Sequence, residues 1–203
     1  MTPFGPIVPG ETPLDDLSGL KIKGITTRAE LNIFEATNIE KVVARYLTVR
    51  PSRRSAKFTF AWCLSLHQEM FGEVWHWAGC QRGRELNLGI ASRAIPENLA
   101  MLLDDLQSWP GFGIDFVEQA ARLHHRAVQI HPFLNGNGRW ARMLANIWLK
   151  HHRQPLTLWP ETMIGATSEA RAAYIAAIKQ ADEGNYNDLI AMHRQYAEAS
   201  TKP

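Results

Sequence analysis

The twelve residues HPFLNGNGRWAR, at positions 131–142, place a base, a glycine-rich turn and two guanidinium groups in one short stretch. His131 has a reference pKa near neutral, so its imidazole can take a proton from an attacking hydroxyl group. Arg139 and Arg142 are three residues apart and lie on nearly the same face of a helix, where both can bind phosphate oxygens. Two arginines favour a di- or triphosphate over a single phosphate. The stretch therefore predicts a nucleotide tail held beside a general base.

The residues between the histidine and the arginines suit a phosphate-binding helix start. The preceding helix must stop at Pro132, and we expect Asn137 to be the N-cap of the next one. The unpaired N–H groups of a first helical turn attract anions. Gly136 and Gly138 lack a Cβ, so the backbone can curl into a nest of N–H groups and phosphate oxygens can approach closely. Each residue also has an ordinary explanation. The proline and glycines could form a plain corner between two helices, the histidine could be structural, and the two arginines could lie on a solvated face. These explanations do not account for all of the residues occurring together.

Helical periodicity covers most of the chain around this loop. Apolar residues recur at three- and four-residue steps, which predicts helices over 26–50, 58–75, 96–109, 115–131, 139–152, 168–181 and 186–199. Residues 79–95 instead combine glycines with alternating apolar positions, which favours a short hairpin or an ordered flap. Residues 1–24 are rich in proline and glycine and are expected to form an extended arm. We therefore expect an all-α domain over residues 25–199 with one small β-hairpin.

Composition limits the class of protein. The chain has 203 residues, 45% of them hydrophobic, which suits one compact domain with a sizeable core. Its 22 Lys and Arg nearly balance 20 Asp and Glu, for a net charge of +2, so a DNA-binding module is disfavoured and we expect no direct nucleic-acid partner. No apolar run is long enough to span a membrane and the first ten residues do not resemble a secretion signal, so we expect a cytoplasmic protein.

Neither the cysteines nor the histidine pairs indicate a disulfide or a metal site. Cys63 and Cys80 have apolar or aromatic neighbours and no C-x-x-C spacing, which favours two buried free thiols. Four of the histidines outside the loop occur as adjacent pairs, at 124–125 and 151–152, whereas two ligands on one helical face need a spacing of three or four residues. We expect no structural metal site.

The loop stretch resembles the signature of the Fic (Fido) domain, H-P-F-x-D/E-G-N-G-R-x-x-R, and departs from it at Asn135. The resemblance extends further, because FGEVWHWAGCQRGRELNLGI at 71–90 looks like the flap region of that family. The segment GETPLDDLSGLKIKGITTRAELN at 10–32 is similar to a Fic subgroup called mobile mystery protein B. The resemblance implies the Fic helical fold, and its subgroup implies a helix-turn-helix partner protein.

The same resemblance implies a protein adenylyltransferase, which moves AMP from ATP to a Ser, Thr or Tyr hydroxyl of a target protein. His131 is then the base and Phe133 anchors the loop in the core. The family pattern assigns the phosphates to Gly136, Asn137, Gly138 and Arg139, and the γ-phosphate to Arg142. Gly138 separates the chain from a phosphate-transferring branch of the family that has lysine at this position.

Asn135 stands where the family has an acidic residue that helps hold Mg²⁺. An amide oxygen can bind a hard cation but brings no charge, so we expect weaker metal binding. The alternative function is therefore a Fic-fold protein that binds a nucleotide or a partner without catalysing transfer.

The segment TTRAEL at 26–31 resembles the inhibitory pattern S/T-x-x-x-E-G/N of many Fic proteins, with Leu31 at the last position. On this hypothesis the carboxylate of Glu30 pairs with Arg142, blocks the γ-phosphate, and Glu30→Gly increases labelling. A threonine followed by a glutamate is also an ordinary helix start. The sequence leaves both explanations open.

Overall fold

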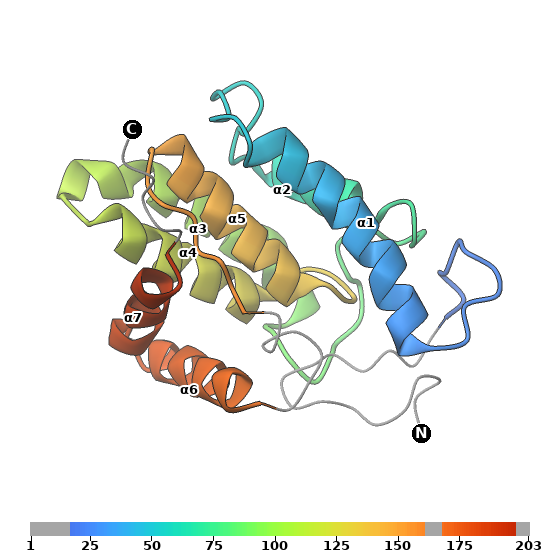
Figure 1. Cartoon of the computed structure of the whole chain (residues 1–203). Helices are drawn as coiled ribbons and strands as arrows, with labels where there is room; N and C mark the ends of the chain where they lie inside the picture. Colours follow the sequence, from blue (N-terminus) through green and yellow to red (C-terminus); the bar gives the residue numbers. More distant parts are fainter. Residues whose placement is uncertain (1–16, 161–167, 198–203) are drawn as a thin grey trace.

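A computed structural model of the chain describes residues 17–160 and 168–197, which form seven α-helices (Figure 1). Their bounds are α1 Arg28–Tyr46, α2 Phe60–Phe71, α3 Ile95–Ser108, α4 Phe116–Ile130, α5 Asn137–His151, α6 Glu169–Asp182 and α7 Asn187–Gln195, with 3-10 turns η1 at Ser92–Ala94 and η2 at Trp109–Phe112. Each helix expected from the sequence is confirmed, with ends that differ by a few residues. Most of the predicted arm, residues 1–16, lies outside the described residues.

Helices α4 and α5 form the centre of the molecule and pack extensively on each other. The side chain of Asp115 starts α4 by accepting hydrogen bonds from the backbone N–H groups of Val117 and Glu118. Helix α4 ends at His131 because the following proline cannot continue the backbone hydrogen bonding. Helices α1 and α2 lie on one side of α5, and α6 and α7 lie on the other (Figure 1). The loop between α4 and α5 therefore sits at one end of the central helix pair.

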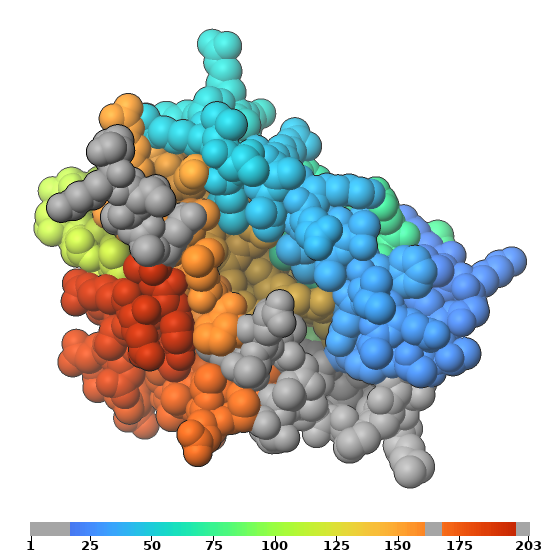
Figure 2. Space-filling model, viewed as in Figure 1, coloured from blue at the N-terminus to red at the C-terminus, as the bar shows by residue number. Residues whose placement is uncertain are grey.

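Two hydrophobic clusters hold these layers together. The larger one surrounds α5 and includes the fully buried rings of Phe71, Trp75, Phe133 and Trp140. A smaller one joins α4 to α6 and α7 through Ala121, Ala177, Leu189 and Met192. In the space-filling view, part of the gold surface of α5 lies recessed between the blue surface of α1 and the orange segment after α5 (Figure 2).

The expected β-hairpin at residues 79–95 is wrong. Within 17–160 and 168–197 the only β pairings are isolated bridges between Leu20 and Trp75 and between Thr157 and Ala197. Side chains, not a partner strand, satisfy the polar backbone groups here: Arg82 donates to the carbonyls of Arg84 and Ile90, and Glu85 accepts from the N–H of Ser92. The segment is an ordered flap without strands, which was the other expected form.

The two cysteines differ from each other. Both are free, but only Cys63 is buried, whereas Cys80 is exposed at the base of the flap, so the expectation of two buried thiols is half wrong. A search of the described helices finds none with the length and apolar character needed to cross a bilayer.

Candidate active site

The loop between α4 and α5 turns on two residues with left-handed backbone conformations. His131 ends α4 with φ 54° and ψ 60°, and Gly136 precedes α5 with φ 78°. A Cβ on Gly136 would lie 2.7 Å from a ring carbon of Phe71, so both the backbone angle and the packing require glycine. The N-cap is therefore Gly136. The expectation that Asn137 is the N-cap is wrong by one residue, because Asn137 is already helical.

The buried side chain of Asn137 holds the loop in place through two hydrogen bonds to its backbone. Its Oδ1 accepts from the N–H of Phe133 at 2.9 Å and its Nδ2 donates to the carbonyl of the same residue at 2.8 Å. Because Asn137 is only 2% exposed, its side chain shapes the loop from within and is not open to a ligand. The Phe133 ring is fully buried and packs edge-on to Trp140, with 5.0 Å between ring centroids.

His67 on α2 contacts the same loop, a role for which the sequence analysis found no signal. The N–H of Gly79 donates to His67 Nδ1 at 3.0 Å, so the ring carries its proton on Nε2, which donates to the carbonyl of Asn135 at 3.1 Å. The ring also stacks on Phe133, with centroids 3.6 Å apart. Burial lowers the pKa of His67 to about 3, which keeps the ring neutral and this tautomer fixed.

The start of α5 offers unpaired donors and two cations. No acceptor among the described residues takes a hydrogen bond from the backbone N–H groups of Asn137, Gly138 and Arg139, as is usual for a first helical turn. A Cβ built on Gly138 would lie 3.6 Å from Nη1 of Arg142, which places that guanidinium beside the helix start. Burial lowers the pKa of Arg142 and the nearby Arg139 cation lowers it further, so an anion between them would be favoured.

Arg139 is held by a buried carboxylate on α1, a contact that the sequence did not predict. Nη1 of Arg139 lies 2.6 Å from Oε2 of Glu35, and Trp75 Nε1 donates to the other oxygen at 2.7 Å. The guanidinium carbon lies 4.7 Å from the centroid of the Phe71 ring. A fixed carboxylate and a ring face together hold the plane of the guanidinium.

Glu30 does not make the contact that the inhibitory hypothesis requires. Its carboxylate accepts from the N–H groups of Thr26 and Thr27 at 2.9 and 3.0 Å, and its own N–H donates to the Thr27 hydroxyl at 3.2 Å. These bonds form a capping box with Thr27 as the N-cap, and they lower the pKa of Glu30. Arg142 has no ion pair with a carboxylate in the part of the chain that the structure describes. The inhibitory role of Glu30 stays a prediction that this conformation does not support.

The two glutamates of α1 give a matched comparison of stability. We expect Glu35→Ala to lower the free energy of unfolding by about 3 kcal/mol, because it leaves a guanidinium and an indole N–H without their buried acceptor. Glu30→Ala removes only an exposed cap and should cost less. Urea titrations of both variants measure the difference. Equal losses would show that the Glu35 carboxylate does not stabilise the fold through these contacts.

His131 has the tautomer and environment of a base. Its Nδ1 lies 3.2 Å from the carbonyl of Val128, which can only accept, so the proton is on Nδ1 and the lone pair is on Nε2. Burial lowers the pKa of His131 to about 4, and the nearby Arg82 cation contributes in the same direction. The imidazole is therefore neutral at pH 7 and able to accept a proton.

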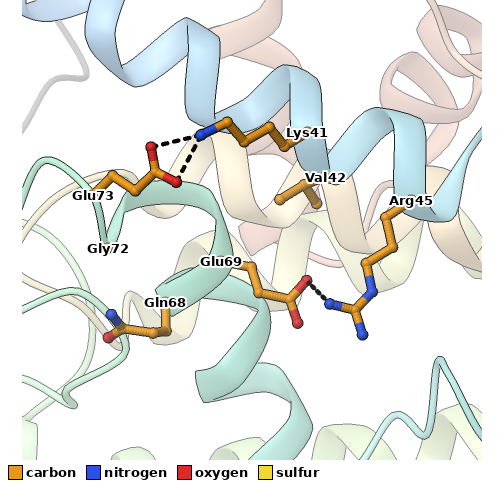
Figure 3. Close-up of a pocket in the computed structure, with 7 residues that line it drawn as sticks. All are labelled: Lys41, Val42, Arg45, Gln68, Glu69, Gly72 and Glu73. Carbon is orange, nitrogen blue, oxygen red and sulfur yellow. Dashed lines mark hydrogen bonds and ion pairs between the residues drawn. The ribbon is translucent and has the colours of Figure 1, made fainter.

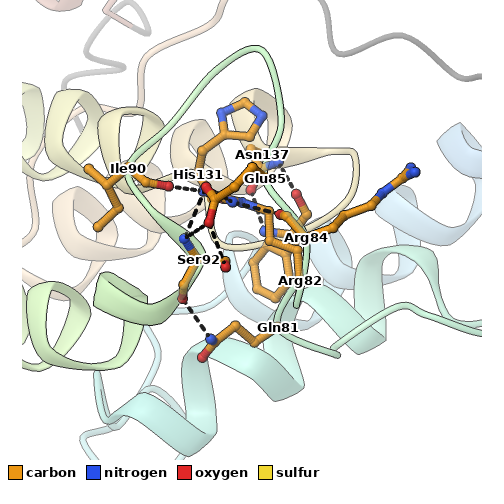
Figure 4. A network of polar contacts seen from close by, with 9 residues as sticks. Gln81, Arg82, Arg84, Glu85, Ile90, Ser92, His131 and Asn137 are labelled. Carbon is orange, nitrogen blue, oxygen red and sulfur yellow. Dashed lines mark hydrogen bonds and ion pairs between the residues drawn. The ribbon is translucent and has the colours of Figure 1, made fainter.

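A buried arginine joins His131 to the flap (Figure 4). Nε of Arg82 donates to the carbonyl of His131 at 2.7 Å, and Nη1 and Nη2 donate to the carbonyls of Arg84 and Ile90. Gly89 packs directly against the histidine, because a Cβ there would lie 2.4 Å from the Cβ of His131. The sequence analysis missed Arg82, whose partners are spread over 49 residues. One cation thus fixes both the left-handed His131 and the shape of the flap.

Asn135 offers a single oxygen for a metal ion. Its Oδ1 accepts from the N–H of Gly136 at 2.7 Å, which keeps the amide at the loop. Across the described segments no group of three or more His, Cys, Asp or Glu could hold a metal. This donor set fits Mg²⁺ only as one neutral ligand of an ion whose other ligands are phosphates and water, which is how proteins commonly hold this cation.

A separate surface hollow of about 400 Å³ lies between α1 and α2 (Figure 3). Lys41 pairs with Glu73 there, and Arg45 lies 3.2 Å from a carboxylate oxygen of Glu69. Alternating charges cancel, so the hollow does not favour an anion, and its lining includes no residue of the α4–α5 loop.

The chain is similar in sequence to known proteins. Residues 57–149 match the model of the Fic/DOC family. Protein adenylyltransferase fic-1 from Caenorhabditis briggsae is 32% identical over 111 residues, or 55% of this chain and 20% of the relative. The protein of the same name from Caenorhabditis elegans is 31% identical over 127 residues, or 61% of this chain and 24% of the relative. The chain thus spans a fifth to a quarter of the length of these curated relatives.

Solved structures show the same fold. Fic-1 from Caenorhabditis elegans superposes with a TM-score of 0.68 at 23% identity, over 86% of this chain and 50% of that chain. BepC from Bartonella tribocorum, solved with bound AMPPNP, gives a TM-score of 0.65 at 18% identity, over 91% of this chain and 94% of that chain.

Proposed function

Because residues 57–149 match the model of the Fic/DOC family, we propose that this chain is a protein adenylyltransferase that moves AMP from ATP to a hydroxyl side chain of a target protein. The observation that supports this most is the placement of a neutral imidazole at one end of the α4–α5 loop. At the other end, two guanidinium groups lie beside the unpaired backbone N–H groups of the first turn of α5. We take residues 25–199 as the functional unit.

The proposed reaction divides the work between the two ends of the loop. Nε2 of His131 takes the proton of the target hydroxyl while the hydroxyl oxygen attacks the α-phosphorus of ATP. A new O–P bond forms, the bond from the α-phosphorus to the bridging oxygen breaks, and pyrophosphate leaves with the electron pair. The N–H groups of α5 and the guanidiniums of Arg139 and Arg142 neutralise the phosphate charge, which is most of what phosphoryl and nucleotidyl transfer requires. When bound, Mg²⁺ supplies further charge neutralisation, with Asn135 as its protein ligand.

The target chemistry and setting are also proposals. A base of this kind suits Ser, Thr or Tyr as the acceptor, and the need for ATP and Mg²⁺ suits the cytoplasm. A helix-turn-helix partner protein has only the subgroup resemblance behind it.

Incubation with cell lysate tests the function. Purified protein, Mg²⁺ and ATP labelled on the α-phosphate should give label that stays on a protein band after denaturation. Reversible nucleotide binding without such a band would instead support the alternative, a Fic-fold binding protein without transfer activity, which Asn135 favours because it lacks the charge of a metal ligand.

Asn135→Asp should strengthen the metal site. The carboxylate adds a charged oxygen at the place where the amide now contacts Gly136, so we expect Mg²⁺ to bind the ATP complex about tenfold more tightly and any transfer to rise. Titration of Mg²⁺ at fixed ATP measures the affinity, with Asn98→Asp as a control away from the loop. Unchanged metal affinity would show that residue 135 is not a ligand.

A further inference from the structure

One side chain of α2, that of His67, contacts both the first residue of the flap and the loop of the candidate active site. The N–H of Gly79 donates to Nδ1 of His67 at 3.0 Å, and Nε2 donates to the backbone carbonyl of Asn135 at 3.1 Å. The imidazole is fully buried, so both of its nitrogens need these partners. His67 thus links Gly79, where the flap begins, to the peptide that follows Asn135.

The hydrogen bond from His67 fixes the plane of the peptide that joins Asn135 to Gly136. The carbonyl and the N–H of a trans peptide point in opposite directions, so the N–H of Gly136 lies on the side away from the imidazole. There it donates to Oδ1 of Asn135 at 2.7 Å. The imidazole therefore sets, through one rigid peptide, the orientation of the Asn135 amide.

The orientation of residue 135 matters more for an amide than for a carboxylate. A carboxylate can present either of two oxygens to a cation, whereas an amide has one oxygen and an NH₂ group that cannot bind a cation. The amide oxygen of Asn135 has two lone pairs, so it can accept from Gly136 and bind Mg²⁺ at the same time. Rotation of this amide by half a turn would instead direct its NH₂ group toward the ion.

Packing holds the imidazole of His67 in its position. The ring stacks on Phe133 with 3.6 Å between centroids and 13° between planes. A Cβ on Gly136 would lie 3.2 Å from Nε2 of His67, so the ring and the turn are in contact. Phe133 is itself fully buried and is bound through its backbone to the Asn137 side chain. The plane of the imidazole and the partners of both its nitrogens are therefore fixed by the fold.

We propose that His67 is a positioning residue for Asn135, which it holds in the orientation that presents the amide oxygen to Mg²⁺ in the ATP complex. This inference rests on the proposed function, which places Asn135 at the metal. Residues that hold a metal ligand by hydrogen bonds contribute to metal affinity without touching the ion. Because the same imidazole accepts from Gly79, it also ties this part of the loop to the start of the flap.

Variants of His67 in the full-length protein test this role. His67→Phe keeps a flat ring against Phe133 but removes the donor to Asn135, so we expect Mg²⁺ to bind the ATP complex about tenfold more weakly. Binding of ATP without metal should change much less. His67→Gln has a side-chain amide long enough to donate to the same carbonyl and should recover part of the Mg²⁺ affinity. Titration of Mg²⁺ at fixed ATP measures these affinities, and wild-type affinity in His67→Phe would overturn the proposal.

The matched control is His193→Phe. His193 on α7 is also buried, with hydrogen bonds to His124 at 3.2 Å and to Thr157 at 2.8 Å, and neither partner belongs to the loop. Both substitutions should lower the free energy of unfolding, but only His67→Phe should weaken Mg²⁺ binding. An equal loss of Mg²⁺ affinity in His193→Phe, or equal affinities in His67→Phe and His67→Gln, would show that the hydrogen bond to Asn135 is not the cause.

Hydrogen exchange separates this proposal from the proposed function, because it needs no nucleotide. In the nucleotide-free protein, the N–H of Gly136 should exchange about tenfold faster in His67→Phe, whereas the N–H of Phe133, which the Asn137 side chain holds, should exchange as in wild type. Unchanged exchange at Gly136, or equal acceleration at both positions, contradicts positioning. A wild type that binds no ATP contradicts the proposed function alone.

A double variant tests the route through Asn135. In an Asn135→Ala background, His67→Phe should cause no further loss of Mg²⁺ affinity, and an additional loss would show that His67 acts by another route. If His67→Phe does not fold, His67→Asn, whose amide is too short to reach the carbonyl of Asn135, takes its place. Mg²⁺ affinity in His67→Asn equal to that in His67→Gln would then refute the proposal.

Discussion

His131→Ala is expected to abolish transfer of AMP to protein while ATP binding and the fold stay intact. The imidazole acts on the attacking hydroxyl and not on the nucleotide, so its loss should lower the transfer rate by about a thousandfold or more with little change in ATP affinity. The left-handed backbone at His131 tolerates the change because Arg82 and the end of α4 still hold the carbonyl and the N–H of this residue. The rate from α-labelled ATP and the dissociation constant from calorimetry measure the two effects separately.

The pH profile gives an independent check on the base. Only the neutral imidazole accepts a proton, and burial lowers its pKa to about 4. The wild-type rate should therefore be nearly flat from pH 6 to 8 and fall as the pH drops through about 4 to 5. His76→Ala, which removes an exposed histidine, is the control and should keep both rate and profile. Comparable transfer by His131→Ala and wild type would rule out general-base catalysis by His131.

Arg82→Met is expected to have the next largest effect. The substitution keeps a long side chain in a fully buried place but removes the donors to the carbonyls of His131, Arg84 and Ile90. Leaving such groups unsatisfied should lower the free energy of unfolding by about 3 kcal/mol and release the flap, with about a hundredfold loss of transfer because His131 is no longer fixed. Since the Arg82 cation also lowers the pKa of His131, the acid limb of the rate profile should move to higher pH.

Arg84→Met is the matched control, since Arg84 is an exposed arginine of the same flap. Urea unfolding, limited proteolysis of residues 79–95 and the rate profile distinguish the two variants. If Arg82→Met keeps wild-type transfer and a protease-resistant flap, then Arg82 does not hold the flap to the base.

The parts of the site that could be predicted from the sequence are those that depend on neighbours along the chain. Helix periodicity depends on nearby residues, and so does the shape of the α4–α5 loop. Pro132 ends one helix, and Gly136 turns the chain into the next. The N-cap was misplaced by one residue because the left-handed conformation of Gly136 already caps α5 and frees the Asn137 side chain to bind Phe133.

The residues of the site that the sequence analysis missed are those whose contacts lie far away along the chain. Glu35 follows the helical pattern of α1 like any solvated glutamate, and only folding brings it to Trp75 and Arg139, which are 40 and 104 positions away. His67 and Arg82 likewise act on the loop across 68 and 49 positions. The hairpin prediction failed for a related reason, because alternating residues in the flap meet an arginine side chain and not a second strand.

Neighbouring residues also explain why Glu30 does not contact Arg142 in this structure. A threonine followed by a glutamate satisfies its own polar groups in a capping box, so the carboxylate has no need of a distant arginine.

The position of the transferred label tests AMP transfer most directly. Purified protein, Mg²⁺ and lysate are incubated with ATP labelled on the α-phosphate or, in parallel, on the γ-phosphate, and the denatured proteins are examined for bound label with His131→Ala as the blank. Attack at the α-phosphorus predicts protein-bound label from the α-labelled ATP alone, lost in His131→Ala. Label from γ-labelled ATP on the same protein band, or no label that depends on His131, would contradict the assignment of this chain as an adenylyltransferase.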